Sequence, residues 1–196
     1  MTPTAQRRAH YDAYVADVIS LCTDNGTRAR LRTGRGQPVH NCRELHRYLT
    51  VLVADHGARR AHYTVAACIA LHRPTPPAPE AALTPPPAQE AEARPAPSWR
   101  SRPNLGAALA RAVHRCRFTP SRAEDQLHTL TRLEADTLHP RLPSLTERLV
   151  NTGTAVDWAV LLDDLAWWDS DHDHVATRWL ESYYLTLHTL TQTKEP

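Results

Sequence analysis

The chain has 196 residues, 41% of them hydrophobic and 22% charged, which is typical of a globular protein and excludes a wholly disordered one. It contains no run of about 18 apolar residues, which excludes a helical membrane span, so we expect a soluble, cytoplasmic protein without a membrane partner. The net charge of +2 hides a division, because residues 1–120 carry 17 basic and 8 acidic side chains (net +9), whereas residues 121–196 carry 6 and 13 (net −7).

Helical periodicity dominates the first 73 residues. Apolar side chains three and four residues apart predict a helix over residues 5–23, with its inner stripe at Tyr11, Tyr14, Val15, Val18, Ile19 and Cys22. Further elements are expected in this order: a short arginine-rich helix at 27–33, a turn at 34–38, a helix at 42–54 and a buried helix at 62–71.

Residues 74–103 differ from the rest of the chain. They are rich in proline, alanine and glutamate, include Pro85-Pro86-Pro87, and show no apolar periodicity. Such a composition is typical of an extended linker, and a compact core rarely contains so long a stretch of it. The sequence therefore predicts an N-terminal helical lobe at 1–73, a linker or surface loop at 74–103, and a C-terminal helical bundle at 104–196.

Five amphipathic helices are expected in the C-terminal bundle. Asn104 is suited to cap the first, and Ser121 with Glu124 three residues later has the pattern of a capping box for the second. Apolar spacing indicates the others near 142–149, 158–168 and 175–190. No convincing strand alternation occurs, so the predicted fold class is all-α, a two-lobed antiparallel helical bundle.

The acidic stretch 163–174 has the composition of a metal site but lacks the spacing of one. An EF-hand loop beginning at Asp169 would need glycine at its sixth and glutamate at its twelfth position, where this chain has histidine and leucine. Two histidines at 172 and 174 do not share a helix face. A cap for the last helix from Ser170 or Asp171 explains the stretch better, so we expect no metal or other cofactor.

Motifs of catalysis are equally scarce. The sequence has no G-x-S-x-G elbow, no P-loop and no G-x-G-x-x-G. The pairs His40/Cys42 and His114/Cys116 combine a base with a thiol, but residues two apart do not face each other on a helix. The four cysteines are widely spaced and are expected to be reduced, with Cys22 and Cys68 on apolar helix faces. We therefore expect no enzymatic activity.

Arginine supplies 22 of the 23 basic residues and is the strongest functional signal. Guanidinium groups neutralise phosphates without reading bases, so their binding depends on salt and hardly on sequence. An arginine-rich coding background, which would leave the side chains merely solvated, is the alternative explanation. The candidate contacts are Arg28, Arg30, Arg32 and Arg35 in one short segment, Arg111 and Arg115 four residues apart, and Arg132 on a further helix.

Five segments of the C-terminal half, in order, resemble the CasB family, the small subunit of the type I-E CRISPR surveillance complex called Cascade. These segments are 104–112 (NLGAALARA), 127–132 (LHTLTR), 156–162 (VDWAVLL), 165–168 (LAWW) and 179–184 (WLESYY). Residues 63–70 and 27–36 resemble its N-terminal half. The resemblance covers most of the chain outside the proline-rich stretch, which is longer than the family leads us to expect.

The resemblance implies an all-α, non-catalytic subunit that pairs with a second copy of itself and lies beside the backbone and large subunits, guide RNA and target DNA. It would stabilise the R-loop and the displaced strand through arginine–phosphate contacts. It supports Arg32, with Arg28, Arg30 and Arg35 beside it, as well as Arg111 and Arg132, and it adds Arg148, all at or near positions that are commonly basic in the family. Asp169 to Asp173 depart from the family pattern, since some members are basic there. A helical protein–protein scaffold without nucleic-acid binding, and a metal-dependent enzyme using residues 163–174, remain as alternatives.

Overall fold

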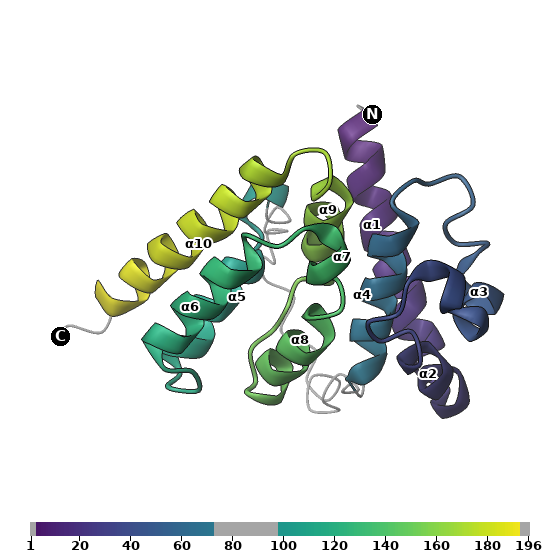
Figure 1. Cartoon of the computed structure of the whole chain (residues 1–196), viewed down its shortest axis with the longest axis horizontal. Helices are drawn as coiled ribbons and strands as arrows, with labels where there is room; N and C mark the ends of the chain where they lie inside the picture. The colour runs from purple at the N-terminus through teal and green to yellow at the C-terminus, as the bar shows by residue number, and fades with distance from the viewer. Residues whose placement is uncertain (1–2, 73–97, 193–196) are drawn as a thin grey trace, which may run out of the picture.

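A computed structural model describes residues 3–72 and 98–192, and within them the chain forms ten α-helices and no strand (Figure 1). The predicted all-α fold class is confirmed. The proline-rich residues 74–97 lie outside the described residues. None of the described helices is long and apolar enough to cross a membrane.

Five helical elements make up the part before the proline-rich stretch: α1 (Pro3–Leu21), α2 (Asn25–Arg32), the 3-10 helix η1 (Val39–Asn41), α3 (Arg43–Leu49) and α4 (Arg59–Leu71). Seven follow it: the 3-10 helix η3 (Trp99–Ser101), α5 (Leu105–His114), α6 (Pro120–Leu130), α7 (Ala135–Leu138), α8 (Leu142–Asn151), α9 (Trp158–Trp167) and α10 (His172–Gln192).

Helix α1 buries most of the stripe predicted for it. Tyr11, Tyr14, Val18 and Cys22 are buried, whereas Ile19, expected on the same stripe, is 39% exposed. Residues 24–26 follow α1, and they begin helix α2 as well as ending α1. The Asp24 carboxylate accepts hydrogen bonds from the backbone N–H groups of the second and third residues of α2, so α2 begins two residues earlier than predicted.

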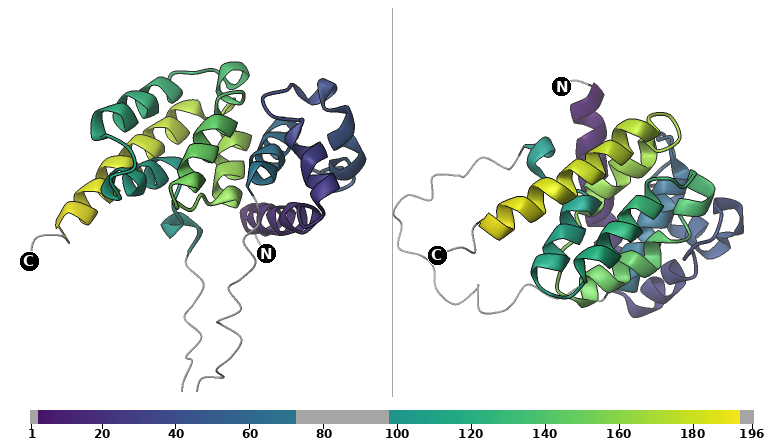
Figure 2. Two further views of the ribbon diagram at one scale, coloured as in Figure 1. Left: turned by 90° about the horizontal axis from the view of Figure 1, so that it is seen from below. Right: turned by 60° about the vertical axis from the view of Figure 1, so that its left-hand side comes forward.

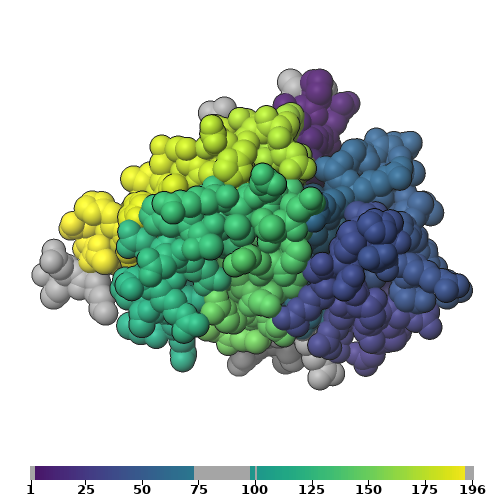
Figure 3. All heavy atoms as spheres, in the orientation of Figure 1, coloured from purple at the N-terminus to yellow at the C-terminus, as the bar shows by residue number. Residues whose placement is uncertain are grey.

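Helix α4 is the centre of the molecule. Every residue from Ala61 to Ala70 is buried, with α1 and α2 packed on one side and α8 and α9 on the other. Polar groups on it are satisfied from both directions: the Tyr14 hydroxyl donates to the His62 carbonyl (2.9 Å), and Thr64 bonds to the His139 imidazole (2.8 Å). The helices before and after the proline-rich stretch thus share one hydrophobic core, and Figure 3 shows their surfaces in direct contact. The division into two lobes stays a prediction.

Helix α10 lies along α5 in every view (Figures 1 and 2), and glycine makes their approach possible. A Cβ atom at Gly106 would stand 1.9 Å from the Trp179 carbonyl oxygen. Asn104 caps α5 as predicted, accepting from the Ala107 N–H (3.1 Å), and its side-chain amide donates to the Arg178 carbonyl (3.2 Å). The α5–α10 pair is therefore fixed by backbone contact as well as by apolar packing.

Two predicted boundaries are wrong. Ser121 does not cap α6, because the helix starts one residue earlier at Pro120, whose fixed φ and missing N–H suit the first turn. Glu124, the other half of the expected capping box, instead accepts a hydrogen bond from the Tyr184 hydroxyl on α10. The helix predicted at 42–54 ends at Leu49, and turns follow it.

Substituting Gly106 with alanine should destabilise the protein by about 2 kcal/mol, because the added methyl group overpacks the contact with the α10 backbone. This would outweigh the roughly 1 kcal/mol by which alanine favours a helix over glycine. Urea unfolding of Gly106→Ala measures the change. The matched control is Gly57→Ala, since nothing lies within 4 Å of the Cβ position there; equal stability of the two variants would contradict the close α5–α10 approach.

Buried His62 predicts a pH dependence of stability. Its pKa is lowered to about 4, chiefly by burial and to a smaller extent by the neighbouring His10 and His56, while the hydrogen bond to the Ala58 carbonyl opposes these effects. The unfolded chain therefore binds the proton more readily, so stability is lost as pH falls from 6.5 towards 4.

From this residue we expect a loss of about 2 kcal/mol between pH 7 and pH 5. His62→Gln should reduce the difference in unfolding free energy between the two pH values by that amount. The exposed His188→Gln should leave the difference unchanged. Identical pH profiles for wild type and His62→Gln would refute the assignment.

Candidate nucleic-acid interface

Three of the predicted arginines lie on α2. Arg28 is half-buried, whereas Arg30 and Arg32 are exposed. The Arg30 guanidinium donates to the Tyr48 hydroxyl at 2.9 Å, which ties α2 to α3. These three cations lie together on the part of the molecule formed before the proline-rich stretch.

Arg35 reaches the other part. It lies in the predicted turn after α2, where Gly36 has φ of +68°, a conformation that favours glycine. This turn lies against the segment before α8, because a Cβ at Gly36 would be 3.5 Å from the Pro140 Cα. From there the Arg35 guanidinium donates to the Ser144 Oγ (2.8 Å) and lies 3.5 Å from the Glu147 Oε2, both on α8.

A groove of about 410 Å³ separates α6 from α8. Its lining includes Gln126, Thr129, Pro140, Arg141, Ser144 and Arg148. Arg148 crosses from α8 to donate to the Gln126 Oε1 (2.5 Å), and its guanidinium carbon lies 5.2 Å from the Phe118 ring centre. Burial lowers the pKa of Arg148, and the nearby positive charge of Arg122 lowers it as well. The second effect shows that cationic side chains lie close together at this groove.

Arg115 extends the basic side chains to the far end of α8. It follows α5 directly and donates to the carbonyl of Gly153, two residues beyond α8. Arg111, one turn earlier on α5, is half-buried. Arg35, Arg148 and Arg115 therefore lie in this order from the start of α8 to its end. We call these three, with Arg141 in the groove, the α8 track.

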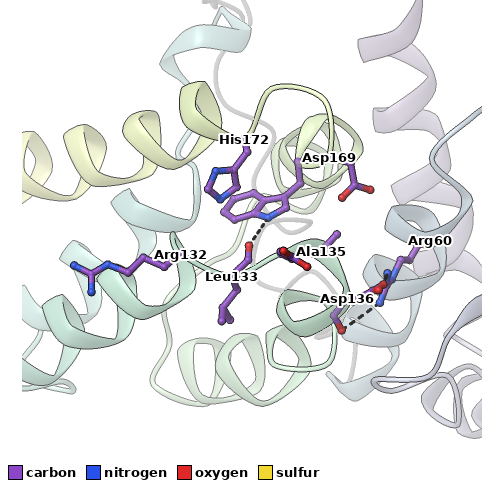
Figure 4. A pocket seen from close by; sticks show the side chains of 9 residues that line it. Arg60, Arg132, Leu133, Ala135, Asp136, Asp169 and His172 are labelled. Carbon is purple, nitrogen blue, oxygen red and sulfur yellow. Dashed lines mark hydrogen bonds and ion pairs between the residues drawn. The ribbon is translucent and has the colours of Figure 1, made fainter.

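The structure does not bring Arg132 into the α8 track. It follows α6 and lines a separate pocket of about 460 Å³ beside Trp168, with Arg60, Asp136, Asp169 and His172. Figure 4 shows Arg132 extending away from the ion pair of Arg60 with Asp136 on the opposite side of this pocket. Positive and negative groups share the lining, so this pocket is not uniformly basic.

Arg122 and Arg141 were missed by the sequence reasoning. Arg141 precedes α8 directly, and Arg122 is near enough to Arg148 to affect its pKa. Neither belongs to a cluster along the chain, so only the tertiary arrangement of α6 and α8 on the two sides of the groove shows that both lie near Arg148. Their exposure was foreseeable from their polar helix positions, but their neighbours were not.

The acidic residues of the suspected metal site have structural partners instead. Buried Asp163 pairs with the Arg7 Nε (3.3 Å), and buried Asp164 accepts from the Trp179 indole (2.6 Å) and from Arg178. Burial raises the pKa of Asp164 to about 7. Within residues 3–72 and 98–192, no three His, Cys, Asp or Glu side chains are placed to hold a metal ion together.

The thiols of the suspected His/Cys pairs contact backbone carbonyls and no imidazole among the described residues. Cys22, Cys42 and Cys68 are buried, which raises the pKa of each, to about 11 for Cys22 and about 12 for Cys68. Cys42 donates to the Pro38 carbonyl (3.4 Å) rather than contacting an imidazole. Cys116 is exposed.

Comparison with known proteins gives consistent matches. The sequence model of the family described as CRISPR-associated protein Cse2 matches residues 27–184. A chain of a solved structure described as a CRISPR RNA-guided surveillance complex is 34% identical, with a TM-score of 0.75, covering 96% of this chain and 99% of that one. A chain from such a complex in a pre-nicking state is 36% identical, with a TM-score of 0.76 and the same coverage. No curated protein sequence matches significantly.

The Arg35 contacts across the two parts should contribute little to folding, because the guanidinium is 44% exposed and Glu147 is 33% exposed. We expect Arg35→Ala to lower the free energy of unfolding by less than about 1 kcal/mol in urea titrations. Glu147→Gln removes the acidic partner of the same ion pair, and it should lower the free energy of unfolding by a similarly small amount. A loss several times larger in Arg35→Ala alone would mean that Arg35 is primarily a structural residue.

Proposed function

Since the chain belongs to the Cse2 (CasB) family of CRISPR-associated proteins, we propose that it is the small subunit of a type I-E surveillance complex and holds nucleic acid through arginine–phosphate contacts. In this role base pairing between guide RNA and target DNA would read the sequence. The subunit would stabilise the R-loop, including the displaced strand, without reading bases. It would have no catalytic residues of its own.

The observation that carries this proposal is the α8 track. Its cations come from both sides of the proline-rich stretch: Arg35 from the turn after α2, and Arg115, Arg141 and Arg148 from the C-terminal part. Among the described residues, only Arg35 of these four has an acidic partner, and that ion pair is partly exposed. Their charge therefore remains available to an anion.

The dimensions of the track suit a phosphate backbone. From Ser144 to Gly153 the chain advances by about 14 Å at 1.5 Å per helical residue. A stacked strand carries one phosphate about every 3.4 Å along its helix axis, so a strand whose axis runs parallel to α8 has about four phosphates over this length. The hydroxyls and amide of the groove, on Ser144, Thr129 and Gln126, can add neutral hydrogen bonds to phosphate or sugar oxygens.

The remaining predicted arginines would act as secondary contacts. Arg28, Arg30 and Arg32 lie on α2, next to the turn that carries Arg35, and could extend the path of a strand beyond the start of α8. Arg111 lies one turn before Arg115. Arg132, in its mixed-charge pocket, has the weakest case.

Protein contacts would hold the subunit in the complex. The partners implied are the backbone and large subunits, a second copy of this chain, the guide RNA and the target DNA. Side chains for protein contact are present at the exposed Trp167 (40%) on α9 and at Tyr184 (43%) and Leu185 (67%) on α10.

Neutralising the α8 track should weaken binding in a salt-dependent manner. For Arg35→Gln/Arg141→Gln/Arg148→Gln, the slope of log affinity for single-stranded DNA against log salt should become shallower by about 2, since each lost phosphate contact removes about 0.7. Electrophoretic retardation across a salt series measures the slope, and retention of target DNA by the assembled complex should fall with it.

The matched control removes three exposed arginines elsewhere, in Arg43→Gln/Arg47→Gln/Arg59→Gln, which changes the net charge equally. Two of these lie on α3, at the far right of Figure 1, away from α6 and α8. If both triple variants keep the wild-type slope, or lose it equally, the α8 track is not the binding surface. An unaltered slope together with intact assembly would favour the protein–protein scaffold.

A further inference from the structure

A second basic site lies away from the α8 track, in a cavity of about 390 Å³ among α1, η3, α9 and α10. The arginines in its lining come from three separate segments: Arg8 on α1, Arg102 directly after η3, and Arg178 on α10, where His174 also lines the cavity. His174, Arg178 and Ser182 are spaced four residues apart and so share one face of α10. Among the described residues that line the cavity, none is acidic.

Two donors in this lining have no acceptor. The Arg8 Nε and the Trp99 Nε1 are both buried, and neither has a hydrogen-bond partner in the described part of the chain. The Arg8 guanidinium carbon lies 5.2 Å, and that of Arg102 4.4 Å, from the Trp99 ring centre. Buried donors are normally satisfied, and an unmet pair beside the same cavity indicates that an acceptor-rich group belongs there.

Arg102 and Arg178, the other two arginines of the lining, are held in place by ion pairs and still have N–H groups without an acceptor. Arg102 is fixed by Asp157 (2.7 Å) and Asp12 (2.7 Å), and Arg178 by Asp164, with none of these carboxylates in the cavity lining. A guanidinium has five N–H donors, and these contacts leave some of them free. The Ser182 hydroxyl accepts from the Asn104 amide (2.9 Å), so its own hydrogen is also free to donate.

Arg8 forms no ion pair with a described residue, although Asp163, Asp164 and Asp171 line an adjoining pocket with it. Burial raises the pKa of Asp164, while the Arg178 charge and the Trp179 indole oppose this shift. The lining thus presents several directed donors to a ligand, in a cavity whose volume lies within the range of ordinary ligand sites.

We propose that this cavity binds a phosphate group, contacted by Arg8, Arg102, Arg178, His174 and the Trp99 indole N–H. A phosphate offers acceptor oxygens in several directions, which matches donors converging from three segments better than the planar carboxylate does. The group could be the terminal phosphate of a nucleic acid strand or that of a free nucleotide. The site is separate from the α8 track and does not depend on the role proposed for it.

The test follows the indole N–H resonance of Trp99, assigned with Trp99→Phe, in the full-length chain during titration with inorganic phosphate, AMP and short oligothymidylates with or without a 5′-phosphate. We expect the resonance to move with millimolar phosphate. Arg8→Gln should weaken the affinity about tenfold, because it removes one charged contact without leaving a carboxylate unpaired.

Further comparisons identify the source of the bound phosphate and provide control variants. Tighter binding of the 5′-phosphorylated than of the 5′-hydroxyl oligomer identifies a strand terminus, and tightest binding of AMP identifies a nucleotide; either result supports the site. His174→Gln, an exposed position, should weaken binding by a smaller factor, and Arg43→Gln should have no effect. A Trp99 resonance indifferent to every probe, or one that moves equally in wild type and Arg8→Gln, overturns the proposal.

The two proposals fail separately. The triple substitution in the α8 track should make the salt dependence of strand binding shallower but leave the phosphate-induced shift of Trp99 intact. Arg8→Gln should weaken phosphate binding in the cavity but leave the salt dependence of strand binding unchanged. If the α8 track substitutions also remove the Trp99 shift, phosphate is bound at the track and not in this cavity.

Discussion

Between Ala61 and Ala70, helix α4 has no side chain that reaches solvent, so other helices must cover it on every side. Helices α1 and α2 cover one side, and α8 and α9 the other. Because α4 ends just before the proline-rich stretch, its burial also brings the two parts of the chain together. The meeting of Arg35 with α8 follows from this packing, since α2 and α8 are both held against α4.

The arginines divide into two kinds by their partners. Arg7, Arg102 and Arg178 pair with buried or partly buried aspartates and join α1, η3 and α10 to α9. Removing any one of them would leave a carboxylate without its partner, at a cost far larger than that of an exposed pair. Those of the α8 track have neutral partners or one exposed acid, so substituting them should change binding more than folding. The arginines of this chain therefore form two groups: those that stabilise the fold through ion pairs with aspartates, and those whose charge is available for binding.

The same division explains why the basic cavity beside Trp99 differs from the α8 track. In the cavity, structural ion pairs fix Arg102 and Arg178, whereas Arg8 forms no ion pair with a described residue. Fixed guanidiniums in an enclosed space suit a single phosphate, whereas an open groove along a helix suits a flexible strand. Several acidic residues that give the C-terminal half its negative charge, among them Asp157, Asp163 and Asp164, lie inside these ion pairs.

The sequence by itself determined the helices, their inner faces and several caps, because hydrophobic periodicity and capping depend on residues within one or two turns. Asn104 at the start of α5 and the turn carrying Arg35 were predicted for that reason. Local patterns failed where neighbours compete, as when Pro120 displaced the cap expected at Ser121. Only the tertiary structure decided which arginines are free, because the carboxylate that neutralises a guanidinium is often far away in the chain: Arg7 and Asp163 are 156 residues apart. For the same reason Arg141, the α8 track and the cavity beside Trp99 became visible only once α4 had been buried and the two parts had met.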